Sequence, residues 1–298
     1  MKKKLTDRIL YARIPEITML IILTLLTAVA VHMFTTEKFD DAFYINSARN
    51  EFSQPVDIKD VSNYSTVPDE KLYNTFIYHV ENTDSNLYYL NKTFDNVEDA
   101  RAYLSLLSHT EDFYFSDGFD AFIYSPLLDG KYTISIDLKS AQEALKINES
   151  NKARLDEISA QIISDDLTTA GILIYINQYI LDTIEYDINH HDLTSALDGK
   201  TRCTGYASLF KALAELNGIR ADIVVGKEFL TDEGHAWVKV YTYGDHVVYF
   251  DPTYNDNSFY GNEYNFMSEE EILQDRTELY TTTYLLRGGY YNPALDVE

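Results

Sequence analysis

The sequence predicts an α+β protein in which a helix that begins with the only cysteine of the chain packs on an antiparallel sheet. The stretch of residues 203–216 begins with Cys203 and carries large apolar side chains at helical spacing. Two stretches with alternating apolar residues come later, at residues 235–242 and 246–253, and the turn sequence Tyr243-Gly244-Asp245 separates them. Ahead of this unit we expect a small α+β region and, before that, an N-terminal transmembrane helix.

The composition narrows the function classes. The chain has 298 residues, of which 45% are hydrophobic, so a packed core is expected. Its formal net charge is −24, which argues against a nucleic-acid partner, because binding to phosphates needs clustered Lys and Arg. A single cysteine excludes an intramolecular disulfide and a multi-thiolate metal site. No segment resembles an EF-hand loop, and we expect neither a metal nor a cofactor.

The N-terminus predicts the compartment. Residues 1–13 form a basic segment, and residues 14–34 contain an apolar run of near membrane-spanning length. The positive-inside rule places the basic end in the cytoplasm and the rest of the chain outside, as a single-pass membrane protein. A cleaved signal peptide is the alternative, because Ala28-Val29-Ala30 fits a small-residue cleavage site. A buried core helix is the third possibility.

Residues 35–148 are expected to form an extracytoplasmic stalk followed by a small α+β region. The stalk covers the polar, acidic residues up to about residue 60. After it we predict a strand at residues 71–81, a helix at residues 95–108, and strands at residues 119–126 and 130–138. This region holds no cluster of residues typical of catalysis.

Residues 149–298 are expected to form a second domain. It would begin with a charged amphipathic helix at residues 151–163 and a more apolar helix at residues 167–186. Asn177 and Gln178 lie in the middle of the apolar helix, which favours a buried core helix over a second membrane span. A polar loop, residues 187–199, leads from it to the thiol.

Cys203 lies in the first turn of the next predicted helix, residues 203–216. Thr201 is its expected N-cap, and Asn217-Gly218 ends it. The unpaired N–H groups and the dipole at a helix start favour the thiolate, which is the nucleophilic form of cysteine. The N–H of Cys203 would also point to where an oxyanion develops. This position is therefore suited to nucleophilic catalysis, although a lone cysteine can also be a small buried hydrophobe.

A strand is predicted at residues 219–225, and the hairpin that follows it supplies the candidate partners of this thiol. Matching the apolar faces of the two hairpin strands pairs Val238 with Phe250 and Val240 with Val248. In that register His235 is a diagonal neighbour of Asp251, within reach of an imidazole–carboxylate hydrogen bond. A structural histidine and a turn aspartate are the simpler interpretations, and a zinc site on the same residues is a further one.

The segment from about residue 172 to 254 resembles the transglutaminase-like core. Three motifs carry the resemblance in order and spacing: Cys203-Thr204-Gly205-Tyr206-Ala207, His235-Ala236-Trp237 and Asp251-Pro252-Thr253. The resemblance implies a papain-like fold with Cys203 as nucleophile, His235 as general base and acid, and Asp251 as the residue that orients it. Lys200-Thr201-Arg202 departs from the short segment common before the cysteine, which we expect to affect only the rim of the site.

Two aromatic residues within these motifs are candidates for substrate binding. Trp237 would form a wall of the cleft beside the thiol, or else pack on the hairpin, and Tyr206 is the second candidate. The implied function is that of a thiol acyltransferase whose partners are protein or peptide substrates at the cell surface. A cysteine peptidase or amidase of the same fold, and a catalytically idle binding module, are the alternatives.

Overall fold

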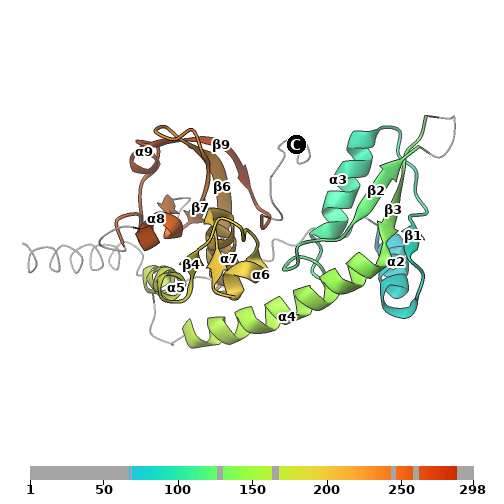
Figure 1. The fold of residues 1–298 in the computed structure, drawn as a ribbon, viewed down its shortest axis with the longest axis horizontal. Helices are drawn as coiled ribbons and strands as arrows, with labels where there is room; N and C mark the ends of the chain where they lie inside the picture. Colours follow the sequence, from blue (N-terminus) through green and yellow to red (C-terminus); the bar gives the residue numbers. More distant parts are fainter. Residues whose placement is uncertain are drawn as a thin grey trace, which may run out of the picture. The chain divides into compact units, whose positions relative to one another are not determined.

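A computed structural model describes residues 67, 69–125, 130–162, 168–242, 246–257 and 262–286 (Figure 1). All of them belong to one compact unit, which runs from Gln54 to Glu298. Their fold is α+β, as predicted, and its three-stranded and four-stranded sheets are antiparallel. The predicted transmembrane segment, residues 14–34, lies outside the described residues. Within the described part of the chain, no helix is both long and apolar enough to cross a bilayer.

The first part of the described chain places helices against a three-stranded antiparallel sheet with the strand order β1-β3-β2. Its elements are α2 (Glu70–Asn82), β1 (Leu87–Tyr89), α3 (Val97–Ser108), β2 (Ala121–Tyr124) and β3 (Thr133–Asp137). The helix predicted at residues 95–108 is confirmed as α3, and Asn96 caps it by accepting a hydrogen bond from the Asp99 N–H at 2.7 Å. The strands predicted at residues 119–126 and 130–138 are confirmed as β2 and β3.

The strand predicted at residues 71–81 is wrong, because this segment is the helix α2. Its Tyr and Phe content favours strands, but Tyr73, Phe76 and Val80 recur at helical spacing and all three are buried. Asp69 also caps the helix, accepting a hydrogen bond from the Leu72 N–H at 3.1 Å. The helical period and the cap therefore outweigh the intrinsic preference of the aromatic residues.

The helix predicted at residues 151–163 is longer than expected. It is α4 (Leu138–Ile162), a single helix of 25 residues that runs through the domain boundary predicted between residues 148 and 149 (Figure 1). Asn148 and Asn151 are buried on it and interrupt the apolar pattern. Asn148 accepts a hydrogen bond from the Phe115 N–H at 2.7 Å, and Asn151 donates to Phe115 O at 2.8 Å. These amides satisfy the backbone of the segment that follows α3, which a periodicity argument cannot foresee.

The second part of the described chain contains the predicted cysteine helix and hairpin. Its elements are α5 (Thr169–Thr183), β4 (Glu185–Tyr186), α6 (Leu193–Leu197), β5 (Lys200–Thr201), α7 (Cys203–Leu216), β6 (Ala221–Glu228), β7 (Gly234–Tyr241), β8 (Val247–Phe250), α8 (Pro252–Asn257), α9 (Glu269–Ile272) and β9 (Arg276–Thr282). The predicted loop at residues 187–199 contains the short helix α6. The four-stranded sheet is antiparallel, with the order β8-β7-β6-β9.

The hairpin register is the predicted one. Val238 pairs with Phe250, and Val240 pairs with Val248. These side chains join α7 in one core, in which the Phe210 ring lies 5.0 Å from the Phe250 ring. Because α7 packs on the sheet through this core, the start of α7 is held in a fixed place relative to β7 and β8.

The core between α7 and the hairpin should carry a large part of the stability. Phe210→Ala removes a fully buried ring, so we expect the free energy of unfolding to fall by about 3–5 kcal/mol. Phe122→Ala is the matched control, because Phe122 is 61% exposed, and it should cost under about 1 kcal/mol. Urea unfolding of both variants checks this. Equal losses would contradict the proposed core.

Candidate active site

Cys203 is the first residue of α7. The residue before it, Arg202, occupies the N-cap position with extended backbone and makes no side-chain capping hydrogen bond. The prediction that Thr201 caps this helix is wrong, because Thr201 lies in β5, where it pairs with Tyr186 of β4. The two-residue parallel pairing of β4 and β5 fixes the chain just before the helix. The positive end of the α7 dipole therefore lies beside the thiol with no capping side chain from Arg202.

Gly205 explains why the helix start fits so closely against β5. A Cβ atom at this position would lie 2.0 Å from Thr201 Oγ1, which is closer than any real contact. Only glycine permits this approach of α7 to β5. The glycine two residues after the cysteine is therefore required by packing, and the packing fixes where Cys203 lies.

His235 and Asp251 come from neighbouring strands of the sheet. His235 is the second residue of β7, and Asp251 follows the end of β8. His235 Nε2 and Asp251 Oδ2 are 2.6 Å apart, and both side chains are buried. The other carboxylate oxygen of Asp251 accepts a hydrogen bond from the Tyr254 N–H at 3.0 Å. The Asp251 carboxylate is thus held from both sides and fixes the orientation of the imidazole.

The Cys203 side chain is the other hydrogen-bonding neighbour of His235. Because Nε2 is engaged by Asp251, Nδ1 is the ring nitrogen left for the thiol. Burial disfavours the charged imidazole, but the negative charge and hydrogen bond of Asp251, together with Cys203, raise the pKa of His235 to about 10. Burial also opposes the Asp251 carboxylate, yet His235 and Arg276 hold the pKa of Asp251 below its ordinary value. An ionised Asp251 and a protonated His235 therefore stabilise each other.

Arg276 is the residue of this cluster that the sequence analysis missed. It is the first residue of β9, it is 1% exposed, and its Nη1 contacts Asp251 Oδ2. Its Nε donates a hydrogen bond to Asp275 Oδ1 at 2.7 Å, and its guanidinium carbon lies 4.5 Å from the centre of the Tyr254 ring. No motif marks Arg276. The only available signal was physical, because a buried carboxylate needs partners that compensate its charge.

Tyr206 and Trp237, the two predicted substrate-binding residues, are both fully buried. Trp237 packs with a small core cluster, and its ring is nearly parallel to that of His235 at 6.0 Å. Tyr206 donates a hydrogen bond from its hydroxyl to Asp256 Oδ2 at 2.7 Å. Neither is among the residues that line the cavity beside Cys203 and His235. In this structure both side chains support the His235 ring and the α7–α8 packing, and neither offers a surface to a substrate.

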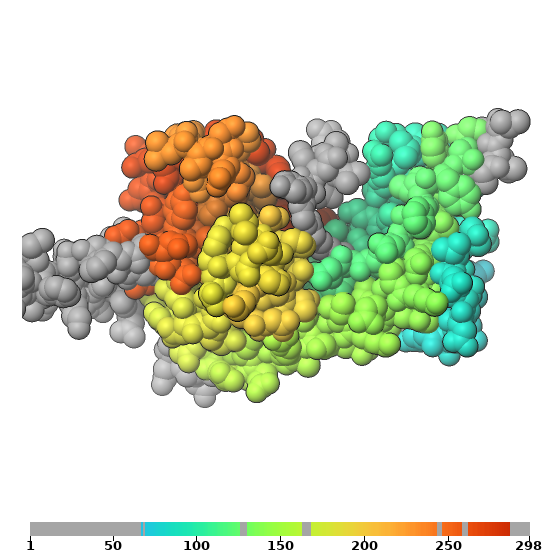
Figure 2. Space-filling model, in the orientation of Figure 1, coloured from blue at the N-terminus to red at the C-terminus, as the bar shows by residue number. Residues whose placement is uncertain are grey.

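A cavity of about 480 Å³ opens beside Cys203 and His235. Its walls come from the end of β4 and the segment after it, the start of α7, and strands β6, β7 and β9. Figure 2 shows the yellow part of the chain, around residue 200, next to the orange part that follows it in sequence. The lining residues are Tyr186, Ile188, His191, Arg202, Cys203, Thr204, Val225, Gly226, Lys227, Glu233, Gly234, His235, Ala236, Leu279, Tyr280 and Leu286.

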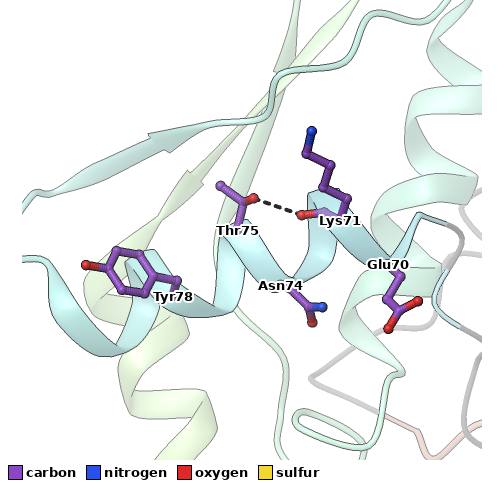
Figure 3. A pocket seen from close by; sticks show the side chains of 5 residues that line it. All are labelled: Glu70, Lys71, Asn74, Thr75 and Tyr78. Carbon is purple, nitrogen blue, oxygen red and sulfur yellow. Dashed lines mark hydrogen bonds between the residues drawn. The ribbon is translucent and has the colours of Figure 1, made fainter.

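A second hollow of about 520 Å³ lies on the surface of α2. Figure 3 shows that its five labelled side chains project from this one helix, and the hydrogen bond drawn there, from Thr75 Oγ1 to Lys71 O at 2.8 Å, is internal to the helix. None of these side chains is a thiol or an imidazole. This hollow has no nucleophile and no acid–base pair among its lining residues, and we assign the candidate site to the cavity at Cys203.

Residues 156–252 match the family model of the transglutaminase-like superfamily. These residues are a transglutaminase-like core. The match begins inside α4 and ends just after Asp251, so it includes Cys203, His235 and Asp251. Arg276 and the rest of β9 lie beyond it.

Similar folds are also found among solved structures, each matching about half of this chain. They include a putative cysteine protease from Cytophaga hutchinsonii, with 14% identity, a TM-score of 0.34, and coverage of 56% of this chain and 67% of that one. A TGase has 16% identity, a TM-score of 0.31, and coverage of 53% and 49%. Calcium-bound LapG of Legionella pneumophila has 14% identity, a TM-score of 0.29, and coverage of 49% and 82%. No curated protein matches the chain.

Substitutions of Arg276 and Asp251 should have non-additive effects on the free energy of unfolding, because the two side chains are in contact. Arg276→Gln removes one of the two cationic partners of the buried Asp251 carboxylate, so we expect a loss of about 3–5 kcal/mol in the free energy of unfolding. The double variant Arg276→Gln/Asp251→Asn should lose clearly less than the sum of the two single losses, because it leaves neither charge unpaired. Urea unfolding of the four proteins measures this. Strictly additive losses would show that the two side chains do not interact.

The raised pKa of His235 makes stability depend on pH in a defined window. Folding binds the proton of His235 more tightly than the unfolded chain does, so the stabilisation is complete below pH 6.5 and is lost as the pH rises to about 10. The difference in unfolding free energy between wild type and His235→Gln should therefore shrink between pH 6.5 and 10. Urea unfolding at several pH values tests this. A difference that stays constant across this window would rule out the assignment.

Proposed function

We propose that the transglutaminase-like core is a thiol acyltransferase that acts on protein or peptide amides. Cys203 would be the nucleophile, His235 the general acid and base, and Asp251 the residue that orients His235. The observation that carries the proposal is the unbroken chain of contacts from Asp251 through His235 to Cys203, which ends at a cavity. This is the arrangement that an activated nucleophile requires.

In the first half of the reaction, the Cys203 thiolate attacks the carbonyl carbon of a carboxamide or peptide amide. A C–S bond forms, and the carbonyl electrons move to oxygen. As the C–N bond breaks, the protonated His235 gives its proton to the departing nitrogen, which leaves as ammonia or an amine. A thioester on Cys203 remains. The charge of Asp251 favours the protonated imidazole, and so keeps the acid available for this step.

In the second half, an amine or a water molecule attacks the thioester carbonyl while His235 takes a proton from it. The C–S bond breaks, the thiolate is restored, and the product is an amide or a carboxylic acid. The rim of the cavity includes the exposed residues Glu233 and Gly234, which gives water a path to Cys203. This access favours hydrolysis by a peptidase or amidase as the second candidate function.

We also propose that this chemistry takes place outside the cytoplasm on a membrane-anchored chain. The support is the basic segment at residues 1–13 followed by the apolar run within residues 14–34. Protein or peptide substrates at the cell surface would then be the partners. The negative net charge of the chain favours basic or neutral acyl acceptors, such as Lys side chains, through electrostatic attraction that weakens with salt.

The full-length chain, purified in detergent, should release ammonia from a Gln-containing peptide and incorporate a labelled amine into it. Cys203→Ala should abolish both signals, and His235→Ala should slow them by about 10²–10⁴-fold, because it removes the general acid and base. His246→Ala is the control, since His246 is an exposed histidine outside the cavity lining, and it should react at the wild-type rate.

The same assay separates the candidate functions. New peptide N-termini in place of amine incorporation would identify a peptidase, and ammonia release without incorporation would identify an amidase. A protein that shows none of these signals over a broad peptide set, although it is folded, would refute the catalytic proposal in favour of a binding module.

A further inference from the structure

A β-bulge lies in the sheet next to the candidate site. Along β6 and β9, Val225 pairs with Tyr280, but the next residue, Gly226, pairs with Glu278. Leu279 is therefore the extra residue of the bulge and has no partner in the β6–β9 ladder. Bulges of this kind redirect a side chain that regular pairing would place elsewhere. Leu279 is one of the residues that line the cavity beside Cys203.

The bulge lies level with the candidate general acid and base. Gly226, where the register shifts, pairs on its other side with His235 of β7. A Cβ atom at Gly226 would lie 2.0 Å from Thr277 O and 2.5 Å from the Trp237 ring, so no side chain can occupy this place. Strand β6, which lies between β7 with His235 and β9 with Leu279, therefore has no side chain at Gly226. The wall formed by Leu279 is two strands from His235, and no side chain of Gly226 separates them.

Leu279 belongs to an apolar surface that the fold leaves uncovered. Leu279 is 58% exposed, Tyr186 at the end of β4 is 45% exposed, and Ile188 just after β4 is 68% exposed. All three line this one cavity, and Val225, Ala236 and Leu286 are its less exposed apolar lining. Apolar side chains gathered around a cavity without being buried are typical of a binding site, since contact with an apolar ligand removes them from water.

The charged residues that line the cavity do not favour a ligand of one charge. Arg202 and Lys227 are balanced in part by Glu233 on the same rim. The ammonium group of Lys227 is paired with Asp232 at 3.0 Å, on the turn between β6 and β7. The feature that distinguishes this cavity is therefore its apolar wall, formed by Leu279 of β9, Tyr186 at the end of β4 and Ile188 just after β4.

We propose that this wall is a specificity subsite that holds an apolar side chain of the substrate next to the amide that Cys203 attacks. The occupant is a peptide segment of a protein substrate with a residue such as Leu beside the reacting group, and Leu279 is its main contact. This inference rests on the proposed function, because it places the subsite relative to Cys203 as the nucleophile.

The test uses the full-length chain and a pair of blocked peptide chloromethyl ketones, which alkylate an accessible thiolate by displacing chloride. The two probes differ only in the residue that carries the reactive group, which is Leu in one and Ser in the other. Iodoacetamide, which has no side chain to recognise, reports the reactivity of Cys203 alone. Intact-mass measurements over time give the second-order rate of labelling for each reagent.

The wild type should react at least about tenfold faster with the Leu probe than with the Ser probe, as expected for a hydrophobic pocket. Leu279→Ser should reduce this ratio several-fold and leave the iodoacetamide rate unchanged. Leu230→Ser is the matched control, because Leu230 is 97% exposed and lies outside the cavity lining, and it should keep the wild-type ratio.

Two results would overturn the inference, and they are distinguishable. A ratio near one in the wild type, or a ratio that Leu279→Ser leaves unchanged, would remove the subsite while Cys203 still reacts with iodoacetamide and the proposed function stands. A Cys203 that no reagent labels until the protein unfolds would remove the proposed function and the subsite with it.

Discussion

The fully buried carboxylate of Asp251 is the constraint on which the arrangement of this sheet depends. A buried charge is tolerated only where partners compensate it, and here they come from different elements: His235 from β7, Arg276 from β9 and the Tyr254 N–H from α8. These partners can meet only if β9 joins the sheet beside β6 and the chain turns directly into α8 after β8. The sheet order and the first turn of α8 are therefore parts of the site as much as the thiol is.

Other buried polar groups hold the elements that carry these residues. The amide of Asn255 on α8 donates to Asn177 of α5 at 3.0 Å and to Asn265 at 2.8 Å, which anchors the helix that follows Asp251. Lys211 of α7 is fully buried, and its ammonium group donates to Ala221 O of β6 at 2.6 Å and contacts Glu215. These bonds tie α7 and α8 to the rest of the core in one geometry, because a buried polar group that shifts loses its partner. The distance between the start of α7 and His235 is thereby fixed by interactions away from the cavity.

Local pattern predicted much of this site, and long-range pairing decided the rest. The apolar alternation of β7 and β8 gave the register in which Val238 meets Phe250, and with it the meeting of His235 and Asp251. Both depend on residues close in sequence, which is why they could be predicted. Arg276 reaches Asp251 only through the pairing of β9 with β6, and no sequence period records that pairing. The residue types of α2 favour a strand, but their spacing is helical. In α4, the buried asparagines interrupt the apolar pattern, so the pattern predicts only the second half of the helix.

Strand β9 links the chemistry of the site to its proposed selectivity. Arg276 at its start contacts Asp251, and three residues later the bulge turns Leu279 to the cavity. A shift of β9 along β6 by one residue would separate Arg276 from Asp251 and also move Leu279 from its place at the cavity, so the two features cannot vary independently. The segment with Tyr186 and Ile188 forms the facing wall and contributes nothing to the Asp251 cluster. Substitutions in that segment can therefore change the substrate preference and leave the buried charge cluster intact. Substitutions that alter the register of β9 change both the charge cluster and the proposed subsite.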